Sequence, residues 1–141
     1  MEPLSRDDVE VWHAFKALGD TVMRRVGADL TAATGLSATD WGVVSRLEDL
    51  GGGRLGQGAL AESVGLTKGG MSNQLTRMTH RGLVQRERGA DGVTVVLTDH
   101  GRDLLHQARP VHAGAVRTHL LDRLSTGERA TVLHIAALLA E

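Results

Sequence analysis

Between residues 59 and 81 the sequence places two helical patterns on either side of one glycine, and this tight turn constrains the fold more than any other feature. The first pattern, Ala59 to Val64, is a short periodic stretch. Gly65 ends it, because glycine adopts the left-handed conformation of a helix C-terminus without strain. Thr67 then offers a side-chain oxygen that can cap a second helix, expected over about residues 68–81. The turn therefore predicts two consecutive helices that lie close together.

Small and apolar residues in this segment indicate how the two helices pack. Ala61 is small at the point where the helices would touch. Along the second helix, apolar residues recur at spacings of four and three, at Met71, Leu75 and Met78. These residues would join both helices into one core, as in a helix-turn-helix unit. On this segment alone, a plain helical hairpin is the alternative interpretation.

A two-stranded ribbon is predicted directly after the second helix. Residues 83–88 and 94–98 are compatible with strands. The segment between them contains Asp91-Gly92, a dipeptide typical of hairpin turns. A ribbon in this position is typical of a winged helix.

Longer helical patterns flank this unit at both ends of the chain. Apolar residues repeat with a period near 3.6 over residues 11–30, and Ser37 can cap another helix that runs to about residue 50. After the ribbon, Thr98 can cap a helix that runs to about residue 124. Pro110 should bend or split that helix, because proline cannot donate its amide.

A glycine-rich connection and a final helix complete the chain. Residues 51–58 contain five glycines, and we interpret them as a flexible loop between helices. A phosphate-binding loop is disfavoured because no strand precedes the segment. Ser125-Thr126-Gly127-Glu128 has the spacing of a capping box, which predicts a last helix beginning there.

Composition excludes several classes of protein. The 141 residues are 41% hydrophobic and 23% charged, which is typical of a folded globular domain. The sequence has no cysteine, which excludes disulfides, thiolate metal sites and cysteine nucleophiles. No nucleophile elbow, metalloprotease motif or paired-carboxylate spacing is visible, so we expect neither an enzyme nor a cofactor. The sequence shows no signal peptide and no apolar membrane span, and a cytoplasmic protein is expected.

The distribution of charge favours duplex DNA as a partner of the two-helix unit. The chain has a formal net charge of −1, but residues 67–88 contain five Lys and Arg residues and one acid, which gives this segment +4 and leaves −5 for the rest. Phosphates respond to this local charge. Aromatic residues make up only 2% of the chain, too few for the stacking platforms that bind single strands. A solvated surface without a partner is the alternative.

Six short motifs follow one another along the chain: Leu60-Ala61 with Val64-Gly65-Leu66, Thr67 with Met71-Ser72 and Leu75, Gly82-Leu83-Val84 with Arg86, Asp91-Gly92, Leu97-Thr98 with Gly101, and Leu124-Ser125 with Glu128. In their order and spacing these segments resemble the MarR family of bacterial transcription regulators over nearly the whole chain. The resemblance implies a homodimer that binds a palindromic operator in double-stranded DNA. It also implies that the protein is a repressor which a small ligand releases.

The element order and the resemblance together give the expected architecture. We expect a mostly α-helical fold with a small β-ribbon wing, in which a winged helix-turn-helix is flanked by N- and C-terminal dimerisation helices. Residues 37–101 would form the DNA-binding domain, and residues 1–36 and 102–141 the helical dimerisation region. The residues expected in the dimer interface are Val11, Val116, Leu120, Ile135, Leu138 and Leu139.

DNA contacts are expected from the second helix of the unit and from the ribbon. Short polar side chains and a cation suit the donors and acceptors of the major groove, so Asn73 or Gln74 would read adenine and Arg77 guanine or a phosphate. Gly69 and Gly70 would let backbone amides approach a phosphate, with a frayed helix start as the alternative. The full set of expected DNA-contacting residues is Lys68, Gly69, Gly70, Ser72, Asn73, Gln74, Thr76, Arg77, Arg81, Arg86 and Arg88.

The predicted wing departs from the family pattern at one position. MarR-like wings usually carry an arginine shortly after the Asp, whereas Asp91-Gly92 is followed here by Val93. The wing tip is therefore a poor candidate for DNA contact, and specificity is expected to rest mainly on the helix. This departure and the acidic total motivate an alternative, a protein-interaction module of the same fold that has lost operator binding.

The resemblance also implies a small-molecule effector, held between the helical dimer part and the winged domain. The aromatic residues and a histidine are the candidates to line such a site, with core packing as the alternative for the apolar ones. These candidates are Trp12, His13, Phe15 and Trp41.

Histidines raise a further alternative, a His-based metal-responsive regulator. His112 and His119 could share a helix face, near His106. Two residues seven positions apart on a helix lie ~10 Å from each other, too far for one zinc ion without other groups. We therefore assign no metal site, and interpret these residues as surface or interface histidines.

Overall fold

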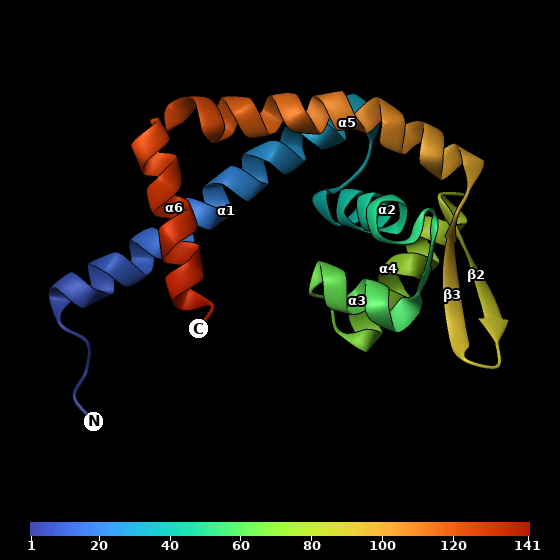
Figure 1. Ribbon diagram of the computed structural model, residues 1–141, viewed down its shortest axis with the longest axis horizontal. Coiled ribbons are helices and arrows are strands. Elements are labelled where there is room, and N and C mark those ends of the chain that lie inside the picture. The colour runs from blue at the N-terminus through green and yellow to red at the C-terminus, as the bar shows by residue number, and fades with distance from the viewer.

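The computed structural model describes all 141 residues and has the mostly helical architecture with a small sheet that the sequence predicts. Two long helices, α1 (Arg6–Thr34) and α5 (Asp99–His119), pack against each other, and the winged unit lies below one end of this pair (Figure 1). No helix combines the length and apolar character that a membrane span requires. The other elements are α2 (Ala38–Gly51), β1 (Arg54–Gly56), α3 (Gln57–Val64), α4 (Lys68–His80), β2 (Val84–Gly89), β3 (Gly92–Leu97), a 3-10 turn (Leu121–Arg123) and α6 (Thr126–Leu139).

The turn between α3 and α4 has the geometry that the sequence predicts. Gly65 has a φ of 72°, in the left-handed region that favours glycine, and its N–H donates to carbonyl oxygens of the last turn of α3. Thr67 Oγ1 accepts a 3.0 Å hydrogen bond from the Gly70 N–H and so caps α4. Local sequence therefore determines where both helices end and begin.

The predicted capping box of α6 is present, and the predicted Ser37 cap of α2 forms a capping box as well. At the start of α2, the Ser37 N–H donates to Asp40 Oδ2 at 2.9 Å, and the Asp40 N–H donates to Ser37 Oγ at 3.0 Å. At the start of α6, Ser125 and Glu128 exchange the same pair of hydrogen bonds. Each box satisfies amides that the helix itself leaves unpaired.

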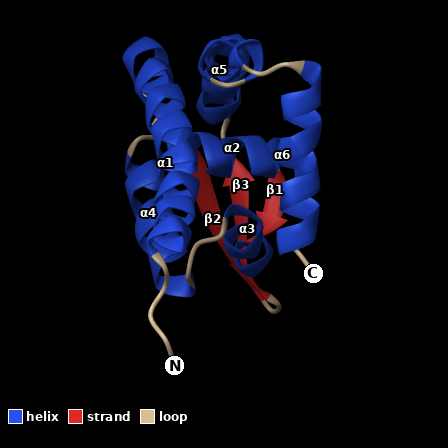
Figure 2. Ribbon diagram, turned by 90° about the vertical axis from the view of Figure 1, so that its left-hand side faces the viewer, coloured by secondary structure: helices blue, strands red, loops and turns tan.

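The interpretation of the glycine-rich segment, residues 51–58, as a flexible loop is wrong in part. The segment contains β1, which pairs antiparallel with β3 and places Arg54 opposite Val96. The sheet therefore has three strands in the order β1-β3-β2, with β3 in the middle (Figure 2). A strand of three residues next to glycines has no local signal, because its stability comes from its partner strand.

The prediction for the helix after the ribbon is also wrong in part. Pro110 lies inside α5 without splitting it, and the helix ends at His119 rather than near residue 124. Packing of α5 against α1 and α2 stabilises the helix around the missing hydrogen bond of the proline.

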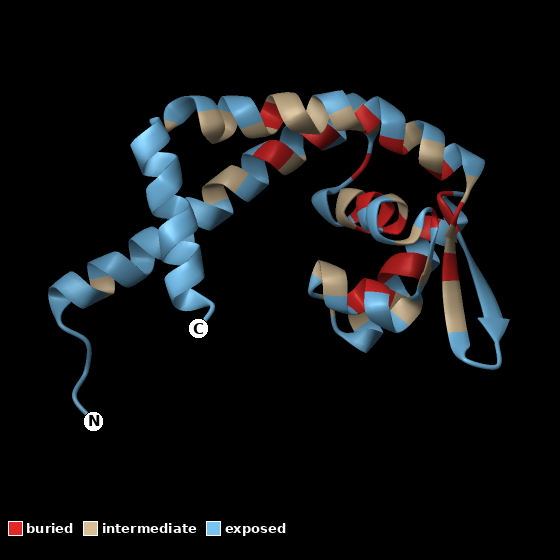
Figure 3. Ribbon diagram, in the orientation of Figure 1, coloured by how far each residue is buried: buried red, intermediate tan, exposed pale blue.

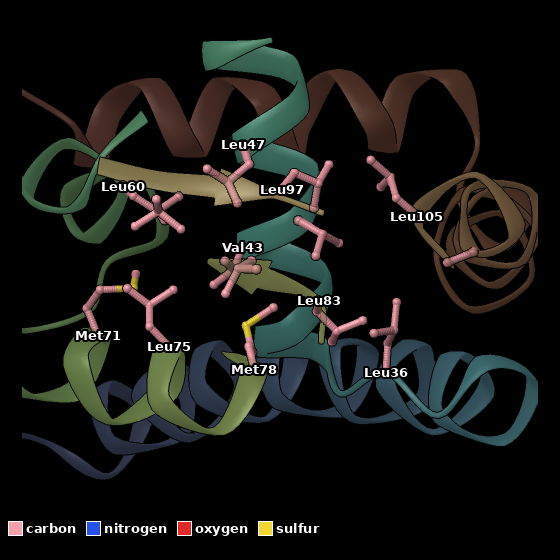
Figure 4. Packing of buried hydrophobic residues seen from close by; sticks show 14 of the residues in the cluster. Leu36, Val43, Leu47, Leu60, Met71, Leu75, Met78, Leu83, Leu97 and Leu105 are labelled. Carbon is pink, nitrogen blue, oxygen red and sulfur yellow. The ribbon is translucent and has the colours of Figure 1, made fainter. Parts of the chain in front are cut away.

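The hydrophobic core is aliphatic and joins α2, α3, α4, the sheet, the C-terminal end of α1 and the first half of α5 (Figures 3 and 4). Its 16 buried residues include no aromatic side chain. They are Leu30, Leu36, Val43, Val44, Leu47, Leu60, Ala61, Met71, Leu75, Met78, Leu83, Val84, Val95, Leu97, Leu105 and Ala108. In contrast, no residue of α6 or of the first half of α1 is buried.

The base of the wing is packed tightly against the first turn of α5. Thr98 Oγ1 donates to the Gly82 carbonyl oxygen at 2.6 Å and accepts from the Gly101 N–H at 2.9 Å. A Cβ atom added at Gly101 would overlap the Leu83 carbonyl oxygen and lie 2.9 Å from Leu97 Cδ1. Glycine is therefore required at this point, because the backbone just before β2 and the helix approach each other closely.

Gly101→Ala is expected to lower the free energy of unfolding by about 1–3 kcal/mol, because the added methyl group overpacks this contact. Urea denaturation monitored by circular dichroism measures the change. Gly114→Ala is the matched control, because Gly114 lies in the same helix with no atom near its Cβ position. That variant should be neutral or up to about 1 kcal/mol more stable. Equal stability of the two variants would contradict the close approach.

Candidate nucleic-acid interface

The outer face of α4 carries most of the residues expected to contact DNA. The side chains of Lys68, Asn73, Thr76 and Arg77 are exposed, and Ser72 is half-buried. Thr76 Oγ1 donates to the Ser72 carbonyl oxygen at 3.0 Å, so this hydroxyl is held against its own helix. The face presents an amide, hydroxyls and cations together, the groups that suit major-groove edges.

The first turn of α4 contains Gly69 and Gly70, and the helix is formed there from Lys68 onward. The alternative of a frayed start therefore does not describe the structure. A Cβ atom at Gly70 would lie 3.0 Å from Thr67 Oγ1, which is tight. Glycine at this position thus leaves room for the capping hydroxyl.

Gln74 does not lie on the exposed face, and the sequence interpretation is wrong on this point. Its side chain is 5% exposed, and its Nε2 donates to Asp40 Oδ1 at 2.7 Å. The spacing explains this position, because Gln74 follows Met71 by three residues and precedes Met78 by four, which puts it on the buried side of the helix. The periodicity of the helix was the available signal that Gln74 faces inward. No sequence pattern indicated its partner Asp40, which lies 34 positions away.

The ribbon brings Arg86 and Arg88 next to α4. Arg86 Nη2 donates to Thr76 Oγ1 at 3.0 Å, and Nη1 lies 3.5 Å from the Ser72 carbonyl oxygen. The Arg88 side chain is exposed and makes no hydrogen bond within the chain. A notch of about 380 Å³ lies between helix and ribbon and is lined by Gln57, Ser72, Thr79, Arg86, Arg88 and Val93.

Arg81 is bound within the chain at the C-terminal end of α4. Its Nη1 donates to Asp40 Oδ2 at 2.6 Å, and its Nη2 donates to the Gly35 carbonyl oxygen at 3.0 Å. Two of its donors are therefore occupied, although the side chain remains partly exposed. A contact between Arg81 and DNA stays a prediction.

Asp40 is the residue of this region that the sequence analysis did not single out for the site. Burial raises its pKa, but hydrogen bonds from the Ser37 N–H, Arg81 and Gln74 outweigh burial and hold the pKa below its ordinary value. The carboxylate is therefore ionised at neutral pH although it is only 4% exposed.

A second cavity, of about 470 Å³, lies where α1, α2, α3 and α5 meet. Trp41 lines it and stacks on His112 of α5, with 4.5 Å between the ring centroids. Met23 of α1 and Val64 of α3 line other parts of the wall. Of the four effector candidates only Trp41 lies here. His112, which the sequence analysis interpreted as a surface or interface histidine, also lines the cavity.

The other three effector candidates lie on the exposed first half of α1. Trp12 and Phe15 stack with 6.4 Å between centroids, and Lys16 Nζ lies 5.2 Å from the Trp12 ring. His13 is exposed. None of the three lines the cavity beside Trp41. The structure therefore does not bring the four candidates together.

The histidines considered for metal have separate environments. His106 is exposed, His112 stacks on Trp41, and His119 Nε2 lies 2.7 Å from Asp29 Oδ2. No group of three or more potential ligands occurs in the chain.

The residues expected at a dimer interface divide into two groups. Val11 is 70% exposed and Leu138 is 53% exposed, and Ile135 and Leu139 are also exposed on α6. Val116 and Leu120 are half-buried within the chain itself. Helix α6 is exposed along its length (Figure 3), and its apolar side chains are not covered by its own chain.

Comparison with known proteins gives a shared fold and a family match over part of the chain. Residues 34–92, which span α2, α3, α4 and the start of the ribbon, match the model of the MarR family. A comparison with curated proteins gives no match.

Several solved structures resemble the whole chain. AbsC, a MarR family transcriptional regulator from Streptomyces coelicolor, is 25% identical, with a TM-score of 0.88 over 99% of this chain and 96% of its own. Sco3205, a MarR family regulator of the same organism in complex with DNA, is 24% identical, with a TM-score of 0.90 over 100% of this chain and 91% of its own. The organohalide-sensing regulator RdhR, bound to 2,4-dichlorophenol, is 17% identical, with a TM-score of 0.83 over 99% of this chain and 85% of its own. With the family match over residues 34–92 and this fold along its full length, the chain is similar to MarR family transcriptional regulators.

Proposed function

We propose that the protein is a transcriptional regulator that binds a palindromic operator in duplex DNA as a homodimer, and that it is a repressor which a small ligand releases. The observation that carries this proposal is the exposed polar face of α4, with Arg77 on it and Arg86 and Arg88 beside it. The similar Sco3205, solved in complex with DNA, supports the proposal.

The exposed face of α4 suits the major groove. The Asn73 amide offers a donor and an acceptor for adenine, and Arg77 offers donors for guanine or a phosphate. Lys68 and the first-turn amides lie at the N-terminal end of the helix, where the helix dipole favours a phosphate. Arg88, which has no partner in the chain, is suited to the DNA backbone.

The apolar side chains that the chain leaves uncovered on α1 and α6 support the proposed dimer. A continuous apolar surface on a folded protein marks an interaction site, and a two-fold pair is the commonest assembly of identical chains. We therefore assign residues 1–36 and 102–141 to dimerisation, and residues 37–101 to DNA binding. Pairing would set two α4 helices about one duplex turn apart, ~34 Å.

The cavity beside Trp41 is the proposed effector site. It lies between the long helices and the winged unit, and its wall combines an aromatic stack with aliphatic side chains. A small, mostly apolar molecule would fit this lining. A ligand there would contact α1, α2 and α5 together and so change how the winged unit sits on the long helices.

Specific binding to operator sites selected from random DNA tests the proposed function. We expect dissociation constants on the order of nanomolar and a steep loss of affinity with added salt, because bound phosphates release counterions. Arg88→Ala should reduce the salt slope by about 1. Arg6→Ala removes the same charge from the start of α1 and should leave the slope unchanged. Weak binding with a flat salt response would instead favour a protein-interaction module of the same fold, for which Val93 at the wing tip and the net charge of −1 are the motives.

The stacked histidine in the cavity predicts a pH dependence of stability. Burial lowers the pKa of His112, so the fold favours the neutral ring. This contribution is present above the ordinary pKa of histidine and is lost as the pH falls through the lower value in the folded protein. His112→Phe keeps a stacking ring that does not titrate.

The stability of the His112→Phe variant relative to the wild type should therefore increase as the pH is lowered from about 7.5 to about 5. Urea denaturation at a fixed protein concentration measures this difference. His106→Gln, at an exposed position, is the control and should keep the wild-type profile. Parallel profiles of wild type and His112→Phe would contradict the buried environment.

A further inference from the structure

The buried carboxylate of Asp40 connects α2 to α4. Asp40 lies in the first turn of α2, and it accepts three hydrogen bonds from side chains and backbone. The Ser37 N–H and Arg81 Nη1 donate to Oδ2 at 2.9 Å and 2.6 Å, and Gln74 Nε2 donates to Oδ1 at 2.7 Å. Two of the three donors therefore come from the α4 region.

The connection continues from Gln74 to the exposed face of α4. Arg77 Nη2 donates to Gln74 Oε1 at 2.7 Å. We call Asp40, Gln74, Arg77 and Arg81 the Asp40 cluster. Within the chain, Arg77 makes no other side-chain hydrogen bond, so Gln74 alone holds its guanidinium.

The charge of Asp40 determines which way the Gln74 amide faces. An ionised carboxylate only accepts hydrogen bonds, so the NH2 group of Gln74 must face it. The amide oxygen then faces Arg77, which only donates. The Asp40 carboxylate thus fixes the orientation of the buried Gln74 amide. That orientation turns the amide oxygen toward Arg77 on the outer face of α4. An uncharged side chain at position 40 that also donates would remove this constraint.

A buried charge is costly to a fold unless its hydrogen bonds are satisfied, and here they are. The ionised state that the lowered pKa of Asp40 indicates is consistent with this arrangement. Neighbouring core positions of α2 and α4 are filled by aliphatic side chains. The Asp40 cluster therefore provides directional hydrogen bonds beside a core that otherwise consists of non-directional apolar contacts.

We propose that Asp40 is a positioning residue for DNA recognition, which acts through Gln74 to hold the Arg77 guanidinium in place on α4. This inference rests on the proposed function. Arg77 placed in advance loses less side-chain freedom when it binds a base. The contribution is to specificity, because random DNA gains nothing from a fixed guanidinium position. Arg81, bound to the same carboxylate, fixes the C-terminal end of the helix against α1 and α2.

Asp40→Asn tests the proposal, because asparagine keeps the shape and lets the Gln74 amide face either way. We expect the ratio of affinities for selected operator and random DNA to fall roughly two- to tenfold, the effect of ordering one long side chain. Asp49→Asn is the matched control: it removes the same charge from the same helix, where Asp49 binds Arg109 on the surface. Its ratio should equal that of the wild type.

Gln74→Met provides a second test that keeps the ion pair between Asp40 and Arg81. It should produce a similar fall in the ratio, and it carries the test if Asp40→Asn does not fold, as judged by thermal denaturation. A gain in operator affinity for Gln74→Met would overturn the proposal, because it would mean that the bond to Gln74 competes with DNA.

A double-mutant cycle shows whether Asp40 acts through Arg77. In the Arg77→Ala background, Asp40→Asn should leave the ratio unchanged. An equal fall in both backgrounds would overturn the proposal, because Asp40 would then act by general stability. If the wild type prefers its operator and neither Asp40→Asn nor Gln74→Met changes the ratio, only this inference fails. If the wild type has no operator preference, the proposed function fails with it.

Discussion

Apolar burial is confined to one half of this molecule, and the rest of the structure depends on that constraint. The chain has only three aromatic residues, and its core is built from Leu, Val, Ala and Met side chains around α2, α4 and the sheet. This core fixes the winged unit and anchors it to α5 through the close contact at Gly101. It does not reach α6 or the first half of α1. One half of the chain therefore fixes the position of α4, and the other half leaves apolar side chains exposed, which is the basis of the proposed dimer.

A locally positive segment of the chain lies in the half that contains the core. The +4 of residues 67–88 lies on the winged unit, although part of it is bound within the chain, since Arg81 is paired with Asp40. Four cations of this segment have no ion-pair partner and are available to phosphates and bases: Lys68 and Arg77 on α4, and Arg86 and Arg88 on the ribbon. A chain with a net charge of −1 can thus present a locally basic face to DNA.

Features with local causes could be predicted from the sequence. The Gly65 turn, the capping boxes of α2 and α6 and the β2–β3 hairpin each depend on residues within a few positions of one another. Features that depend on distant partners could not. Strand β1 forms only because β3 lies beside it, and α5 continues through Pro110 because packing outweighs one lost hydrogen bond.

The candidate site shows the same limit. Exposure of Asn73 and Arg77 follows from helical periodicity, but the inward direction of Gln74 requires a carboxylate on another helix. A polar residue at a core spacing is the available signal for such a partner, and it does not say where the partner lies. Likewise the stack of Trp41 on His112 joins residues 71 positions apart, with no pattern linking them.

The proposed function requires two copies of the chain to place their α4 helices side by side on one DNA duplex. Because the chain has no native cysteine, His80→Cys introduces a unique spin-label site at the exposed C-terminal end of α4. Pulsed dipolar spectroscopy should give one narrow distance distribution on operator DNA, as expected for recognition helices centred ~34 Å apart. The absence of any dipolar coupling on the same DNA would mean that a single chain binds, and would contradict the account.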